Sequence, residues 1–147
     1  MRSGIQTILS EAGEAACYAL TLGKVAEKWI RENRDPDFVQ DACLVVLAGI
    51  DSGAVYYDED APDNNNNFFV EDPSKLLRIL TGVNWEVFKA EPGYVPKPGE
   101  FAIQRWERTK TGAVLGHFRL RDWDPVRDSA TVRLGAIVSQ RICRTVR

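Results

Sequence analysis

The order of hydrophobic patterns along the chain predicts an α+β protein in which N-terminal helices pack on a C-terminal antiparallel β-sheet. In the first part of the sequence apolar residues recur every three or four positions, as on one face of a helix. From Asn84 onward they alternate with polar residues, as in strands. Helices followed by a run of strands are typical of the α+β class. A chain of 147 residues is close to the usual size of one domain, so residues 1–147 are expected to form a single domain.

The first predicted helix covers residues 15–32. Its core face is defined by four apolar residues at spacings of four, three and four, namely Tyr18, Leu22, Val25 and Trp29. A flanking stripe carries Cys17 together with Thr21, Lys24 and Lys28. Because two residues of this stripe are charged, Cys17 is not required to point into the core.

Two further helices and a short strand are predicted in the next part of the chain. Asp35 can cap a second helix that runs from residue 36 to about 48, with proline in its first turn. After it we expect at most one short strand, at 55–57, before a loop rich in turn-forming residues. The sequence Asp-Pro-Ser at 72–74 then opens a short helix that Gly82 closes.

The rest of the chain is predicted to form strands. The expected strands are residues 84–90, 100–108, 114–121, 129–134 and 136–143. The second and third form one hairpin, and the last two form another around Gly135. In the strand 114–121, alternation places Val114, Gly116, Phe118 and Leu120 on one face and Leu115, His117, Arg119 and Arg121 on the other.

Charge and hydropathy argue against several classes of function. The formal net charge of −2 gives no general reason to expect a nucleic-acid partner, although an acidic stretch at 51–72 precedes an arginine-rich part of the chain. We interpret the acidic stretch as a solvated loop beside a basic sheet face, with a nucleic-acid-binding sheet as the alternative. No apolar run approaches the roughly 20 residues that cross a bilayer, and no secretory signal is visible. A cytoplasmic location without a membrane partner is therefore expected.

The three cysteines, Cys17, Cys43 and Cys143, form no CxxC pair, and the chain has a single histidine. An odd number of scattered cysteines argues against a disulfide framework, and the usual zinc site needs four cysteine and histidine ligands. Free thiols fit a reducing compartment. No phosphate-binding or dinucleotide-binding glycine pattern is present. We therefore expect neither a metal nor another cofactor.

One combination of residues can carry chemistry, namely the thiol of Cys17 and the imidazole of His117. A cysteine hydrolase needs a thiolate, a base that generates it and a third group that orients the base. Cys17 is expected near the first turn of its helix, where the helix dipole favours a thiolate. Asp122 and Asp124 follow His117 where the chain must turn, so either can return to the imidazole. The plainer interpretation, an unreactive thiol and two aspartates that only form a turn, stays open.

Three short segments, in this order, resemble the papain-like cysteine peptidase superfamily. They are ACYAL at 16–20, GHF at 116–118 and the DP element within WDPVRDSATVRLG at 123–135. Within the superfamily the chain is similar to the double-glycine peptidases that process bacteriocins and to NlpC-type cell-wall amidases. It most resembles a bacterial and prophage family of short proteins. The resemblance covers the helix around Cys17 and most of residues 84–142.

The resemblance implies a papain-like fold with Cys17 as nucleophile, His117 as general base and Asp124 as the orienting carboxylate, with Asp122 in reserve. The implied reaction is hydrolysis of a peptide or amide bond, in a peptide or peptidoglycan-like substrate, through a thioester on Cys17. The chain departs from the family pattern at Ala16, where glycine is common, and it lacks a glutamine at the spacing of an oxyanion-hole donor. The alternative is a catalytically inert papain-fold interaction module of a mobile element.

Overall fold

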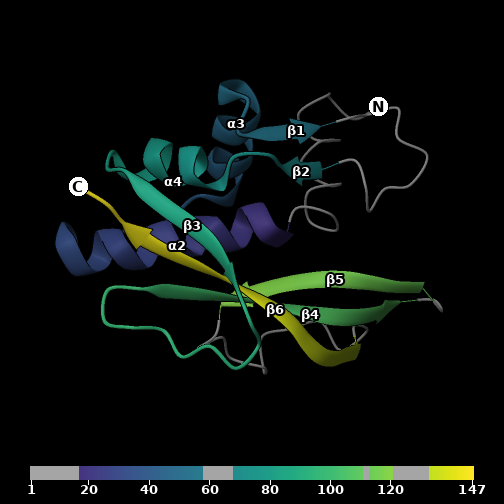
Figure 1. Ribbon diagram of the computed structural model, residues 1–147. Helices are drawn as coiled ribbons and strands as arrows, with labels where there is room; N and C mark the ends of the chain where they lie inside the picture. The colour runs from purple at the N-terminus through teal and green to yellow at the C-terminus, as the bar shows by residue number, and fades with distance from the viewer. Residues whose placement is uncertain (1–16, 58–67, 111–112, 121–132) are drawn as a thin grey trace, which may run out of the picture.

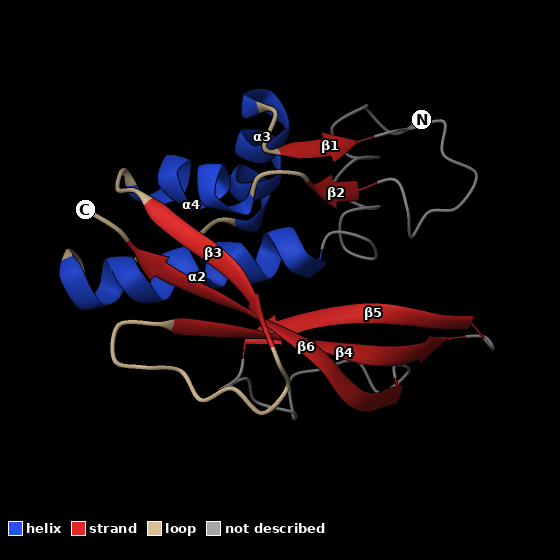
Figure 2. Cartoon of the chain, in the orientation of Figure 1, coloured by secondary structure: helices blue, strands red, loops and turns tan. Residues whose placement is uncertain are grey.

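The computed structural model describes residues 17–57, 68–110, 113–120 and 133–147. Within these residues three helices lie on one side of a four-stranded antiparallel sheet, and a two-stranded sheet lies beside the second of them (Figure 1, Figure 2). The mixture of helices and antiparallel strands confirms the predicted α+β class.

Helix α2 (Cys17–Asn33) confirms the first predicted helix and its core face. All four predicted core residues contact the core, and Leu22 and Val25 have no exposed surface. Thr21, on the flanking stripe, is buried as well. The first turns of the stripe that carries Cys17 are therefore packed against the rest of the protein. The two lysines of the stripe had suggested that it faces solvent.

Helix α3 (Ala42–Ser52) begins six residues later than predicted, because a different aspartate caps it. Asp41 Oδ1 accepts hydrogen bonds from the backbone N–H groups of Cys43 (2.8 Å) and Leu44 (3.4 Å). Asp35, the predicted cap, instead accepts a hydrogen bond from the backbone N–H of Asp37 (3.0 Å) in a local turn. The start at residue 36 was therefore wrong.

Helix α4 (Pro73–Thr81) confirms the third predicted helix at both ends. Asp72 accepts a hydrogen bond from the backbone N–H of Lys75 (3.0 Å) and proline occupies the first turn. Gly82 ends the helix with φ of 79°, a left-handed conformation that glycine adopts without steric cost.

Strand β1 (Val55–Tyr57) confirms the short predicted strand, but it pairs with a strand that was not predicted. This partner is β2 (Phe68–Val70), antiparallel to β1 with Val55 opposite Val70. The predicted loop ends at residue 67, and no element was predicted for residues 68–70. Three residues are too few for a recognisable alternation, so the pairing defines the strand.

The main sheet has the strand order β3-β6-β4-β5, and each neighbouring pair is antiparallel. Its strands are β3 (Trp85–Ala90), β4 (Phe101–Lys110), β5 (Ala113–Leu120) and β6 (Arg133–Thr145). The hairpin of β4 with β5 confirms the predicted one. The last strand of the chain lies in the interior of the sheet, between β3 and β4.

The predicted hairpin around Gly135 was wrong, because Gly135 lies inside the 13-residue strand β6. The proposed first arm, at 129–134, lies largely outside the described residues. Strand β6 pairs with β4 through two irregularities in register, between Arg105 and Trp106 and between Trp106 and Arg108. Such bulges accommodate glycine within a strand, so a glycine between two apolar stretches did not mark a turn.

The core lies between the helices and the face of the sheet that they cover. Its buried members include Leu22, Val25, Val45, Val46, Leu76, Leu77, Trp85, Ile103 and Cys143. At its margin, the indole Nε1 of Trp85 donates to the hydroxyl of Thr81 (2.8 Å), which joins the end of α4 to the start of β3. Burial of a large apolar side chain stabilises a fold by about 1.5–3 kcal/mol, so this layer supplies most of the driving force.

Candidate functional site

Cys17 is the first residue of α2 and is partly exposed. Its backbone carbonyl accepts a hydrogen bond from the hydroxyl of Thr21, one turn further along the same side of the helix (2.5 Å). The same hydroxyl lies 3.2 Å from the backbone carbonyl of Phe118 in β5. The stripe of α2 that carries Cys17 therefore faces strand β5.

The first turn of α2 is held against β5 by an aromatic stack. The rings of Tyr18 and Phe118 lie 4.4 Å apart, centre to centre, with an interplanar angle of 14°. These residues directly follow Cys17 and His117 in the sequence. The backbones of the predicted nucleophile and the predicted base are thus brought into the same region of the molecule.

His117 lies in β5 opposite Trp106 of β4. The neighbouring positions Phe118 and Leu120 pack against the core, on the side of the sheet that α2 covers. Strand side chains alternate between faces, and this alternation predicts the opposite face for position 117. Asp124 and its reserve Asp122 lie outside the described residues, so the structure brings together the chain segments of Cys17 and His117 only.

Two arginines lie beside the aromatic stack. The guanidinium carbons of Arg105 and Arg141 are each 5.8 Å from the centre of the Phe118 ring, within the range of a cation–π contact. Burial raises the pKa of Tyr18 well above its ordinary value, while the charge of Arg141 opposes this shift. The phenol therefore stays protonated. The two guanidinium groups place positive charge next to the first turn of α2.

The three thiols are free and differ in their surroundings. Cys43 is exposed at the start of α3, whereas Cys143 is fully buried in β6. Burial raises the pKa of the Cys143 thiol to about 12, so it stays protonated at neutral pH. Among the described residues no group of three or more histidine, cysteine or acidic side chains is placed to hold a metal ion.

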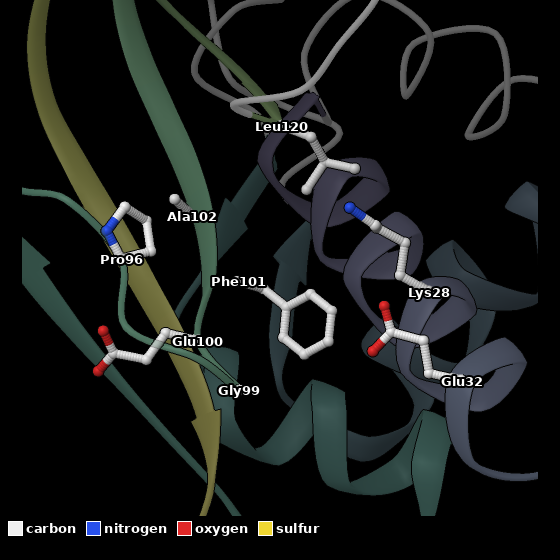
Figure 3. Close-up of a pocket in the computed structure, with 8 residues that line it drawn as sticks. All are labelled: Lys28, Glu32, Pro96, Gly99, Glu100, Phe101, Ala102 and Leu120. Atoms are coloured by element: carbon white, nitrogen blue, oxygen red, sulfur yellow. The ribbon is translucent and has the colours of Figure 1, made fainter.

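A hollow of about 390 Å³ lies between the second half of α2 and the start of β4. Lys28 and Glu32 project toward it from α2, and the ring of Phe101 projects from β4 (Figure 3). The carboxylate of Glu100 is turned away from that ring (Figure 3). The hollow therefore has a mixed lining of charged and apolar groups, in a different part of α2 from Cys17.

Glu100 fixes the connector that precedes β4. Its Oε1 accepts hydrogen bonds from the hydroxyl of Tyr94 (2.7 Å) and the backbone N–H of Lys97 (2.9 Å). Its Oε2 lies 3.5 Å from the guanidinium of Arg144. These contacts, the Lys97 N–H first among them, lower the pKa of the Glu100 carboxyl despite its burial. This carboxylate is a structural anchor.

Comparison of the chain with protein-family models, with curated protein sequences and with solved structures found no match in any of the three. The described helices include none with the length and apolar character needed to cross a bilayer. The interpretation of the site therefore depends on the contacts of the residues themselves.

Sequence reasoning did not single out Arg105 and Arg141 as neighbours. It noted only that arginine is frequent from Arg105 onward. The register supplies the missing information, because it pairs Arg105 directly with Phe118 and places Arg141 in the adjoining row, opposite Ile103.

Proposed function

We propose that this protein is a papain-like cysteine hydrolase that cleaves a peptide or amide bond through Cys17. The observation that carries the proposal is the packing of the first turn of α2 on β5, through the Tyr18–Phe118 stack and the Thr21 hydroxyl. A helix that begins with a cysteine and rests on the strand of the only histidine brings the two chain segments together, which is the first condition for such chemistry.

In the proposed reaction, His117 accepts the proton of the Cys17 thiol as the sulfur attacks the scissile carbonyl carbon. The tetrahedral intermediate collapses, the carbon–nitrogen bond breaks, and the imidazolium gives its proton to the leaving amine. Water activated by the same imidazole then attacks the thioester, which releases a carboxylic acid and restores the thiol. Asp124 orients the imidazole. No cofactor enters these steps.

The proposed substrate is a peptide or a peptidoglycan-like stem, and the proposed location is the cytoplasm. Three free thiols fit a reducing compartment. The charge of the chain gives no general support for a nucleic-acid partner.

The decisive experiment compares the alkylation rates of thiols within one chain. Iodoacetamide labelling followed by mass spectrometry of peptides reports Cys17 and the exposed Cys43 in the same sample. If an imidazole generates the Cys17 thiolate, Cys17 should react faster than Cys43 at about pH 6 to 7, where an ordinary thiol of pKa about 8.5 is mostly protonated. His117→Ala should remove that advantage.

The proposal is wrong if Cys17 reacts no faster than Cys43 at any pH and His117→Ala leaves its rate unchanged. Cys43→Ala serves as the matched control, because it removes a thiol from the same chain without touching α2. Hydrolysis of a peptide library, abolished by Cys17→Ala and retained by Cys43→Ala, would establish turnover.

A second candidate is the inert papain-fold interaction module, and one observation favours it. Phe118 occupies the α2 side of β5, so regular alternation predicts that His117 belongs to the other side. In that case the alkylation rate of Cys17 would be insensitive to His117→Ala, and no peptide would be hydrolysed.

A further inference from the structure

We propose that Arg105 and Arg141 form a subsite for a carboxylate of the substrate, next to the first turn of α2. This inference rests on the proposed function and narrows it to acidic peptides. Both guanidinium groups lie beside the Phe118 ring, which also stacks on the ring of Tyr18, directly after Cys17. An anion held there would lie beside the helix start that carries the thiol.

The register of the sheet places these groups on one surface. Arg105 is paired with Phe118 on one side and with Ser139 on the other, so the three residues share a row and a face. Arg141 occupies the next position on that face of β6, and one of its terminal nitrogens donates to the hydroxyl of Ser139 (2.9 Å). The two cations and a hydroxyl thus converge near the start of α2.

The hydrogen-bonding state of Arg105 points to a missing acceptor. Its Nε is buried and has no hydrogen-bond partner. Among the described residues, neither Arg105 nor Arg141 forms an ion pair with a carboxylate. By contrast Arg144, which lies in the same strand as Arg141, pairs with Glu86 and Glu100. A buried charged donor without an acceptor is unfavourable, and a ligand carboxylate would satisfy it.

The chemistry of the pair favours a carboxylate. Guanidinium groups bind carboxylates through paired N–H donors in a planar fork, and such bonds strengthen where aromatic rings exclude water. Strands β4, β5 and β6 extend past the first turn of α2 (Figure 1), and the row of Arg105, Phe118 and Ser139 lies beside that turn. An acidic side chain or chain end near the scissile bond would fit this location.

Binding to a chain that cannot turn over tests the subsite separately from catalysis. Cys17→Ala protein is titrated by calorimetry with N-acetyl-alanylglutamate and with N-acetyl-alanylglutamine amide, which has a similar size and no charge. We expect the carboxylate probe to bind at least about tenfold more tightly, and that advantage to shrink as salt rises. Equal binding of the two probes, or no binding of either, would overturn the proposal.

Variants assign the effect to the two arginines. Arg105→Gln and Arg141→Gln should each weaken carboxylate binding about tenfold, and Arg105→Lys should weaken it less because the charge remains. Arg78→Gln is the matched control, since Arg78 is an exposed arginine of α4. Unchanged affinity in both glutamine variants would overturn the assignment.

The two proposals fail in different ways. If the arginines are already paired with carboxylates of this chain, neither probe binds, and the alkylation rate of Cys17 is unaffected. If instead the carboxylate probe binds but Cys17 shows no enhanced reactivity, the anion subsite stands and the hydrolase does not. Hydrolysis of neutral and acidic peptides at equal rates would overturn the subsite alone.

Discussion

The stack between Tyr18 and Phe118 should have a measurable coupling energy, because it joins the helix of the predicted nucleophile to the strand of the predicted base. Its centre-to-centre distance is 4.4 Å and its planes are 14° from parallel. Aromatic pairs contribute about 0.5–1.5 kcal/mol beyond the area they bury. We therefore expect Tyr18→Leu and Phe118→Leu to be coupled by about 1 kcal/mol.

The single changes have different expected costs. Phe118→Leu also removes the two cation–π contacts, each worth about 0.5 kcal/mol where solvent is near, so it should cost about 2 kcal/mol in all. Tyr18→Leu should cost about 1.5 kcal/mol. Because the stack is lost in either single variant, the double variant should cost about 2.5 kcal/mol rather than the full sum.

Urea unfolding followed by circular dichroism gives the four free energies of unfolding that the cycle needs. The exposed pair of Tyr56 and Phe69, whose ring centres are 6.4 Å apart, serves as the control cycle and should show weaker coupling. Additive costs for Tyr18→Leu and Phe118→Leu, within about 0.3 kcal/mol, would show that the stack does not join α2 to β5.

Thiol reactivity, acid stability and glycine substitution test three other parts of the fold. Ellman's reagent should label Cys43 in the folded protein but Cys143 only after unfolding, because burial raises the Cys143 pKa to about 12; prompt native labelling of Cys143 would contradict this. The lowered pKa of Glu100 implies stability that is present above the unfolded carboxyl pKa of about 4.3 and is lost as the pH falls through the folded value. Glu100→Gln should flatten that loss in a profile of unfolding free energy against pH, and parallel profiles would disprove the linkage. Gly49→Ala should cost about 1–3 kcal/mol, since a Cβ there would lie 2.6 Å from a valine methyl carbon of β1; Gly93→Ala, with no heavy atom within 4 Å, should be near neutral in the same urea assay, and equal stability of the two variants would refute the packing argument.

Local signals predicted those parts of the fold that local contacts determine. The ends of α4 depend on Asp72 and Gly82, which lie next to the helix in the sequence. The residue types at these two positions therefore predicted both ends. The start of α3 was misplaced because Asp35 and Asp41 are both good caps, and only the packing of the apolar residues after Asp41 selects between them. A turn was predicted at Gly135 because the sequence does not show that β4 pairs with β6 on both sides of this glycine.

In the candidate site, too, local signals predicted some features and long-range pairing determines the others. The position of Cys17 at the start of a helix followed from helix periodicity, and the hairpin of β5 followed from alternation. The convergence of Arg105 and Arg141 on Phe118 depends on the strand order and on register, which are long-range properties. Sequence reasoning could place each arginine on a strand but could not bring the two together.

Two measurements constrain each other. They are the coupling energy of Tyr18 with Phe118 and the effect of His117→Ala on the alkylation rate of Cys17. A one-residue change of register exchanges the two faces of a strand. If the Tyr18–Phe118 coupling is observed, Phe118 occupies the α2 side, and a catalytic His117 then requires a departure from regular alternation between the two residues. The register of β5 with β4 is regular through His117 and Phe118, and the irregularities of the sheet lie in the adjoining β4–β6 pair, beside Arg105. Strong coupling together with a Cys17 alkylation rate that falls in His117→Ala would therefore show that β5 departs from this regular register in solution. Strong coupling with an unchanged rate would favour the inert interaction module.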